Sequence, residues 1–452
     1  MTKWLDIPKH GYTCLSLRMW AVHLILIISI FTPVFVSLSY AEVLTLPQGL
    51  RLAQEGSRLI KINQEQEKIY EGDTLIAKSA LLPSLNVSAN QTFFAKQPFA
   101  VFGPVTVPTS EKNFPSYSLS IQQLLYDFGG TISRYRSSKA ILETRKLDTV
   151  RMRNFVSLDF ALVYFDLLES EKLMRVAESE VRTLESHLRD AKNLYENGVI
   201  TKNDLLQAEV RLSDARQKVL NAKNLRAINA SRLNTVLSRS LDTEIQVMDV
   251  EFAQSGYTVL DRGKAFEVAV QERPEVRIIV ETMNALNLEE KSKKAEYYPT
   301  FFASASYDYT DNRYLLHEAN ASLVLGMSLN LFSGGSTRAE LIKTEYRRRQ
   351  LLEQKARVED EVRLEVEKNL LDLSNARERM KVAEDAVGQA EENLRINKVR
   401  YEEGVGTATE VLDAVTLLTT AETNHYRALY DFRRAEASVF YSMGKDLVEV
   451  YR

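Results

Sequence analysis

Two stretches of the chain carry apolar residues at the spacing of a coiled coil. In the first, the steps alternate between four and three residues, at Ala177, Val181, Leu184, Leu188, Ala191 and Tyr195. In the second, they alternate between three and four, at Leu205, Ala208, Leu212, Ala215, Val219 and Ala222. This period forms the seam of a coiled coil, and the alanines on it predict close helix approach. We interpret the charges between the seams as solvated surface.

Proline and glycine are absent from long parts of the sequence, which predicts long helices. No proline occurs in residues 116–273 or in residues 300–452. Long segments without these breakers, rich in Ala, Leu, Glu, Lys and Arg, favour helix. We predict two long helices, each followed by a return helix, at about 131–197, 201–237, 336–403 and 407–443. A 67-residue helix such as 131–197 would span about 100 Å.

The first 41 residues have the three parts of a secretory signal peptide. Basic residues precede an apolar run at 20–38, and small residues at Ser39 and Ala41 fit a cleavage site. A membrane anchor is the alternative, although His23, Ser29 and Pro33 interrupt the run. Cys14 precedes the run, so it is not a lipoprotein cysteine. Cleavage after Ala41 would remove a net charge of +2 and leave the mature chain at −5.

Segments that alternate polar and apolar residues precede each long helix. They predict four strands, at about 84–96, 114–125, 300–310 and 319–331. Alternation over about ten residues, with small polar residues on one face, is typical of transmembrane β-strands around a wet lumen. A soluble, half-buried sheet alternates in the same way. Three features favour the membrane interpretation: the predicted export of the chain, the aromatic residues at the strand ends, and the proline-containing loop 96–114.

The order of these elements occurs twice. Three features recur in order: Pro83 and Pro299, the glycine pairs 129–130 and 334–335, and the turns 195–199 and 401–405. We therefore predict a tandem duplication, with residues 42–255 as the first structural repeat and 256–452 as the second. Each repeat would contain a helix, two strands, a very long helix and a return helix.

Composition excludes several classes of function. The 452 residues contain 58 basic and 61 acidic side chains, so no basic surface for nucleic acid is predicted. One cysteine rules out a disulfide framework and a multi-thiolate zinc site. The three histidines after the leader, His187, His317 and His425, have no metal-ligand spacing. No nucleophilic triad, phosphate-binding loop or redox motif occurs, so we predict no enzyme activity, no cofactor and no metal.

Four strands cannot close a barrel, so the membrane interpretation requires assembly. An open sheet edge in lipid leaves backbone groups unpaired, at a cost of several kcal/mol each. Closed membrane barrels begin at eight strands. Two, three or four copies of the chain would supply eight, twelve or sixteen strands, and these alternatives stay open on the strand count alone.

The duplicated order of motifs resembles the TolC family of outer-membrane efflux proteins over the whole mature chain. The strand exit LYDFGG at 125–130 and the turn YEEGVGTATEVLDA at 401–414 carry the resemblance most clearly. It implies a homotrimer with a twelve-stranded barrel in the outer membrane of a Gram-negative bacterium. An α-helical coiled-coil tunnel would continue across the periplasm, and its tip would contact a periplasmic adaptor and an inner-membrane pump.

The two helix turns carry motifs with a purely structural interpretation. Thr201 and Asp204, like Thr407 and Glu410, fit the capping box T-x-x-D/E. In this box the threonine caps the return helix and the acid accepts a hydrogen bond from a free amide. Helix capping alone would account for the acidic residues Asp204 and Glu410, without any role in a channel.

The resemblance adds a gating interpretation of the same region. It places Glu410 and Asp413 where the family has two carboxylates that line the periplasmic constriction. It places Asp204 and Tyr401 where an inter-helix bond helps to hold the channel shut. The sequence departs from the family at Gly406, where the best-known member has an arginine, so a charged clasp is missing there.

Both turns also contain glycine, which suits a tight connection between antiparallel helices. The resemblance further implies that the exposed tips meet the adaptor, through Gly198, Val199, Ile200, Gly404, Val405 and Gly406. We therefore expect the exit duct of a tripartite efflux or type I secretion system, passive at this component. The alternative is a coiled-coil spacer or surface stalk of the cell envelope without a pore. Drug efflux, metal efflux and protein secretion are not separable from these motifs.

Overall fold

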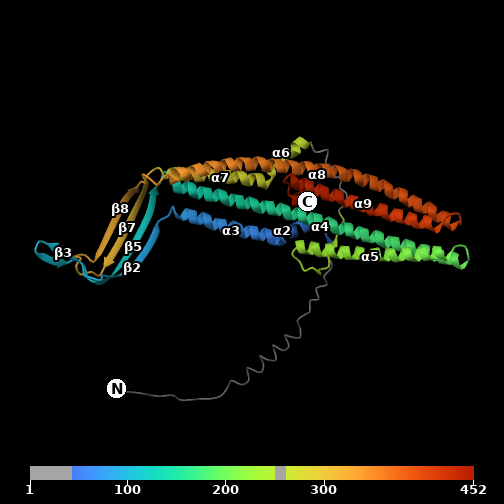
Figure 1. Cartoon of the computed structure of the whole chain (residues 1–452), viewed down its shortest axis with the longest axis horizontal. Helices are drawn as coiled ribbons and strands as arrows, with labels where there is room; N and C mark the ends of the chain where they lie inside the picture. Colours follow the sequence, from blue (N-terminus) through green and yellow to red (C-terminus); the bar gives the residue numbers. More distant parts are fainter. Residues whose placement is uncertain (1–42, 250–260) are drawn as a thin grey trace, which may run out of the picture. The chain divides into compact units, whose positions relative to one another are not determined.

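A computed structural model describes residues 43–249 and 261–452 (Figure 1). The predicted signal peptide, residues 1–41, lies outside the described residues. So does the segment around residue 255 where the first predicted repeat ends.

Eight of the described helices form two sets of equal lengths, and the ninth is the short C-terminal α10 (Leu447–Val450). The first set is α2 (Leu46–Gly56), α3 (Arg58–Ser79), α4 (Gly130–Glu196) and α5 (Lys202–Val236). The second set is α6 (Arg262–Glu272), α7 (Pro274–Ala295), α8 (Ser336–Glu402) and α9 (Ala408–Ser442). In both sets the lengths run 11, 22, 67 and 35 residues in chain order. Among the described helices, none combines the length and apolarity needed to cross a membrane.

The long helix α4 is the centre of the helical packing. It contacts α3, α5, α7 and α9 along its length, while α8 packs against α6, α7 and α9. The main apolar core surrounds Phe160, Tyr164 and Phe165 on α4, which are almost fully buried. The Tyr164 hydroxyl lies 3.0 Å from the Leu44 carbonyl oxygen and 2.5 Å from that of Met248. These contacts tie the short parallel strands β1 (Val43–Leu44) and β6 (Gln246–Val247) to α4.

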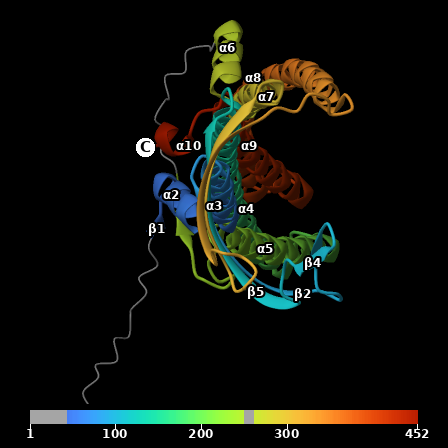
Figure 2. The ribbon, with the colours of Figure 1, turned by 90° about the vertical axis from the view of Figure 1, so that its left-hand side faces the viewer.

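Four antiparallel strands form one sheet in the order β2-β5-β7-β8. They are β2 (Ser84–Phe93), β5 (Asn113–Tyr126), β7 (Thr300–Thr310) and β8 (Ala319–Ser328). The central pair, β5 and β7, joins strands from the two halves of the chain. Figure 2, which shows the molecule from the sheet end, shows that this sheet is curved.

The strand register sorts the side chains of the sheet into an apolar and a polar face. On one face, two successive rows cross all four strands: Leu85, Ile121, Ala305 and Leu323, then Val87, Leu119, Tyr307 and Ala321. The intervening row on the other face contains Asn86, Ser120, Ser306 and Ser322. Neighbours on the polar face bond to each other, as the Ser118 hydroxyl does to an Asp308 carboxylate oxygen at 2.5 Å.

Two strands are shorter than the alternation predicts. The strand predicted to reach residue 331 ends at Ser328, because Ser328 pairs with Thr300 and the next residue of β7 would be Pro299, which has no N–H to donate. The strand predicted to reach residue 96 ends at Phe93, opposite the first residue of β5. The predicted loop 96–114 contains a further hairpin, β3 (Phe99–Phe102) and β4 (Val105–Pro108).

Candidate functional site

The turns between α4 and α5 and between α8 and α9 lie at the same end of the molecule, opposite the sheet (Figure 1). One apolar cluster joins all four helices near these turns. It includes Leu184 of α4, Leu212 of α5, Leu394 of α8 and Val411 of α9. The four helix ends of one chain therefore form a single packed unit, which we call the tip.

Both turns are built around a glycine in the left-handed region. Gly198 has a φ of 71° and Gly404 a φ of 75°. The following amides donate back into the preceding helix, from Val199 to the Leu194 carbonyl and from Val405 to the Arg400 carbonyl, both at 2.9 Å. A Cβ at either glycine would meet open space, so the backbone conformation and not the available room requires glycine.

Both predicted capping boxes are present. The Asp204 carboxylate accepts from the Thr201 amide at 3.0 Å, and the Asp204 amide donates to the Thr201 hydroxyl at 3.3 Å. The Glu410 carboxylate accepts from the Thr407 amide at 3.0 Å, and the Glu410 amide donates to the Thr407 hydroxyl at 3.2 Å. These acids therefore satisfy free amides at the starts of α5 and α9, as the structural interpretation of the motif predicts.

Gly406 is confined by the end of α8. A Cβ at Gly406 would lie 3.0 Å from the Tyr401 amide nitrogen and 3.1 Å from two Arg400 atoms. The Gly406 amide also donates to the Arg400 carbonyl at 2.9 Å. Any larger residue here would push against backbone, which gives a steric reason for the glycine at this position.

Tyr401 is buried in the tip. It is 6% exposed, and its hydroxyl has no hydrogen-bond partner within residues 43–249 and 261–452. Burial raises the pKa of Tyr401, and the carboxylates of Asp204 and Asp190 raise it further. Tyr401 and Asp204 are thus close enough to interact electrostatically, but no direct hydrogen bond joins them in a single chain.

Glu410 and Asp413 lie one turn apart on α9 but have different surroundings. Glu410 lies 3.9 Å from Arg400 in an ion pair, measured from carboxylate oxygen to guanidinium nitrogen. Asp413 is exposed and lines a groove of about 550 Å³ between α5 and α9, together with Asn203, Leu206, Gln207, Val210, Arg211, Asp214, Thr409 and Leu412. In the described part of the chain, no cluster of three or more His, Cys, Asp or Glu side chains could hold a metal ion.

The seam prediction missed one member of the tip. His187 lies outside the predicted seam of α4, but it is 4% exposed and its ring centroid lies 5.2 Å from that of Tyr401. The buried positions of α4 here are Ala177, Glu180, Leu184, His187 and Ala191. They follow the same three-four period, and the buried face is wider than one seam because α4 packs on both α5 and α9. A search of the sequence for a second row of residues at the three-four period, beside the predicted seam, could have identified His187 as buried.

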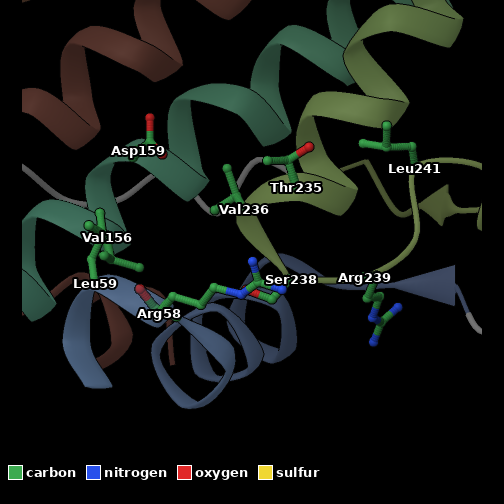
Figure 3. A pocket seen from close by; sticks show the side chains of 10 residues that line it. Arg58, Leu59, Val156, Asp159, Thr235, Val236, Ser238, Arg239 and Leu241 are labelled. Carbon is green, nitrogen blue, oxygen red and sulfur yellow. The ribbon is translucent and has the colours of Figure 1, made fainter. Parts of the chain in front are cut away.

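A second hollow, of about 380 Å³, lies far from the tip along the chain's helices. Its lining includes Arg58 and Leu59 of α3, Asp159 of α4 and Arg239 beyond α5. Figure 3 shows the side chains of Asp159 and Arg239 directed away from each other. Because the charged groups of Asp159 and Arg239 do not point toward a common position, this hollow is not a candidate for ligand binding.

Comparison with known proteins agrees with this architecture. The family model described as "Outer membrane efflux protein" matches residues 50–239 and 266–445. Two relatives are "Alkaline protease secretion protein AprF" of Pseudomonas aeruginosa, 22% identical, and "Outer membrane efflux protein BepC" of Brucella suis, 20% identical. Each alignment covers 89% of this chain and 85% of the relative.

Solved structures support the fold. The outer membrane protein VceC from Vibrio cholerae superposes with a TM-score of 0.75 at 17% sequence identity, over 88% of this chain and 96% of VceC. The family match, in two segments that together span most of the sequence, agrees with the resemblance found from the motifs. The chain therefore belongs to the outer membrane efflux protein family, a family of outer-membrane channels with a periplasmic helical tunnel.

Proposed function

We propose that this chain is the trimeric exit duct of a tripartite efflux or type I secretion system, gated at its helix tip. The observation that carries the proposal is the sorting of the sheet into an apolar and a polar face. The exposed apolar face includes Leu85, Val87, Leu323 and Leu325, each 64% exposed or more. A sheet with one apolar and one polar face is suited to separate the lipid bilayer from an aqueous lumen.

The edges of the sheet explain why copies would assemble. β2 and β8 each pair on one side only within the described chain. Buried in lipid, their free N–H and C=O groups would cost several kcal/mol each. Pairing β8 of one copy with β2 of the next removes both edges, and the family resemblance favours three copies, which supply twelve strands.

At the other end, assembly would bring the tips together around the duct. Three copies would place Glu410 and Asp413 in one ring of six carboxylates, which would attract cations and repel anions. Asp204 and Tyr401 would regulate how tightly neighbouring helices close. The ring gives the tip a selective constriction in addition to its structural caps.

The exposed tips are also the surface through which we expect a periplasmic adaptor and an inner-membrane pump to connect. Val199 is 63% exposed and Val405 is 70% exposed, although both are apolar. The pump would supply the energy, and transport through this component would be passive. The names of AprF and BepC point to protease secretion and to efflux, and a duct of this kind suits either cargo.

The competing proposal is a coiled-coil spacer or stalk without a pore. A spacer has no use for apolar rows that align across four strands, so this observation favours the duct. The test is to purify the protein from the outer-membrane fraction and compare unheated and heated samples by gel electrophoresis, then to measure conductance in planar bilayers. A heat-modifiable trimer that conducts ions is expected, and a soluble rod that never conducts would refute the duct.

A further inference from the structure

The tip contains a buried polar pair that neither capping nor the carboxylate ring uses. His187 comes from α4 and Tyr401 from α8, and their rings are tilted by 50° with centroids 5.2 Å apart. His187 is 4% exposed and Tyr401 is 6% exposed. Within the described residues, neither the His187 Nε2 atom nor the Tyr401 hydroxyl has a hydrogen-bond partner. Buried polar atoms are nearly always paired, so two neighbouring rings that each carry an unpartnered polar atom are an unusual feature.

The surroundings of this pair are mostly apolar. Tyr401 belongs to the apolar cluster of the tip, together with Leu212 and Ala215 from α5 and with Ala408, Val411, Leu412, Ala414 and Val415 from α9. Apolar neighbours can accommodate a neutral imidazole, but they provide neither a hydrogen-bond acceptor nor a negative charge for an imidazolium. The site therefore discriminates between the two protonation states of His187.

The charged groups near the pair come from three helices. On α4, Asp190 favours the charged form of His187, and on α8, Lys398 opposes it. On α5, Asp204 acts on Tyr401. On α9, the side chains that join the cluster are apolar. Burial outweighs these contributions and lowers the pKa of His187 below its usual 6.5.

We propose that His187 is a pH-sensitive latch of the tip. In the neutral form its ring packs against Tyr401 and holds α4 to α8, and protonation loosens this contact and favours the open tip. The latch rests on the proposed function, because it regulates the same helix tip that gates the duct.

The direction of the pH dependence follows from the burial. In an opened tip His187 is hydrated and titrates near 6.5, whereas in the packed tip it holds a proton less readily. Above about pH 6.5 both states contain neutral histidine, so the packed tip is fully stable. As the pH falls below this value, the opened state gains protons first, and the packed tip loses stability progressively.

The test uses the purified full-length protein in planar bilayers at pH 7.5 and pH 5.5. The wild type is expected to show conductance several-fold higher at pH 5.5. His187→Gln and His187→Leu cannot titrate, and both are expected to lose this increase. His425→Gln and His317→Gln are matched controls, because they remove the other two histidines of the described chain and should behave like the wild type.

Hydrogen exchange of residues 184–196 and 394–403, corrected for the intrinsic effect of pH on exchange, gives a readout that does not depend on a pore. Protection of both segments should fall at pH 5.5 in the wild type but not in either His187 variant. A pH response that persists in both His187 variants, or a wild type without one, would overturn the latch. If no protein conducts at either pH, the duct itself is refuted, and the exchange comparison alone then decides the latch.

Discussion

Arg400 at the end of α8 forms an ion pair with Glu410 at the start of α9, with a guanidinium nitrogen 3.9 Å from a carboxylate oxygen. The pair closes the same turn that Gly404 and the Thr407 capping box build. Both side chains are nearly half exposed, at 48% and 42%, so the pair contributes at most about 1 kcal/mol to stability. If the proposed carboxylate ring forms, Arg400 would offset part of its negative charge, and the pair would then affect charge selectivity more than folding.

The double variant Glu410→Gln with Asp413→Asn is expected to lower the preference of the duct for cations. It removes six carboxylates from the proposed ring, whereas glutamine at position 410 can still accept the capping hydrogen bond. Reversal potentials across a KCl gradient measure the effect. Asp360→Asn on the exposed surface of α8 is the control. Equal selectivity in the double variant and the wild type would leave Glu410 and Asp413 as cap and surface charge.

Two adjacent residues of β2 test which face of the sheet meets lipid. Val87 lies in an apolar row and Ser88 on the polar face. Val87→Arg is expected to reduce membrane insertion, because arginine near the middle of a lipid-facing strand costs about 2–4 kcal/mol. Ser88→Arg should insert normally and shift ion selectivity toward anions. The yield of heat-modifiable oligomer in the outer-membrane fraction gives the comparison, and similar yields for both variants would contradict the assignment of the faces.

Two glycines of α8 and its turn should respond oppositely to alanine. Gly404→Ala places a Cβ on a residue with a φ of 75° and is expected to lower the stability of the tip by about 1 kcal/mol. Gly388 lies inside α8 with open space around it, so Gly388→Ala should raise stability by about 0.8 kcal/mol. Thermal unfolding of the two variants provides the measurement. A stabilising effect of Gly404→Ala would show that the turn does not need the left-handed conformation.

Arg434 on α9 is expected to have a pH-dependent effect on stability. Its guanidinium lies 2.9 Å from Asp166 and 2.7 Å from Glu169, both on α4. Burial raises the pKa of Glu169, and Arg434 opposes this by stabilising the carboxylate. Arg434→Gln should therefore cost about 2 kcal/mol at pH 7, because it leaves the largely buried Glu169 without its guanidinium partner.

The sign of this dependence follows from Glu169. Without Arg434 its pKa rises further, so the folded state takes up a proton more readily as the pH falls. The destabilisation caused by Arg434→Gln should therefore shrink toward pH 4.5. Denaturant unfolding at the two pH values tests this, with Arg363→Gln in an exposed ion pair as the control. A loss of stability that is the same at both pH values would mean that Glu169 is not the affected group.

The sequence by itself determined the helices and the strand faces. The helices α4, α5, α8 and α9 contain no proline, glycines lie beside most of their ends, and the observed ends lie within one residue of the predicted ones. Helix ends depend on local caps and breakers, which a sequence displays directly. The T-x-x-D/E motifs likewise predicted both capping boxes.

The tertiary structure alone decided how far the buried helix faces extend beyond the predicted seams and where the strands stop. The burial of His187 against Tyr401 depends on α4 packing against α5 and α9 at once; the sequence contains a second stripe at the three-four period, but not the identity of the helices that cover it. β8 ends at Ser328 because its partner strand begins at Thr300, although the alternation continues in the sequence. Both outcomes arise from contacts between segments far apart in the chain, and such contacts exist only once the helices and strands have packed together.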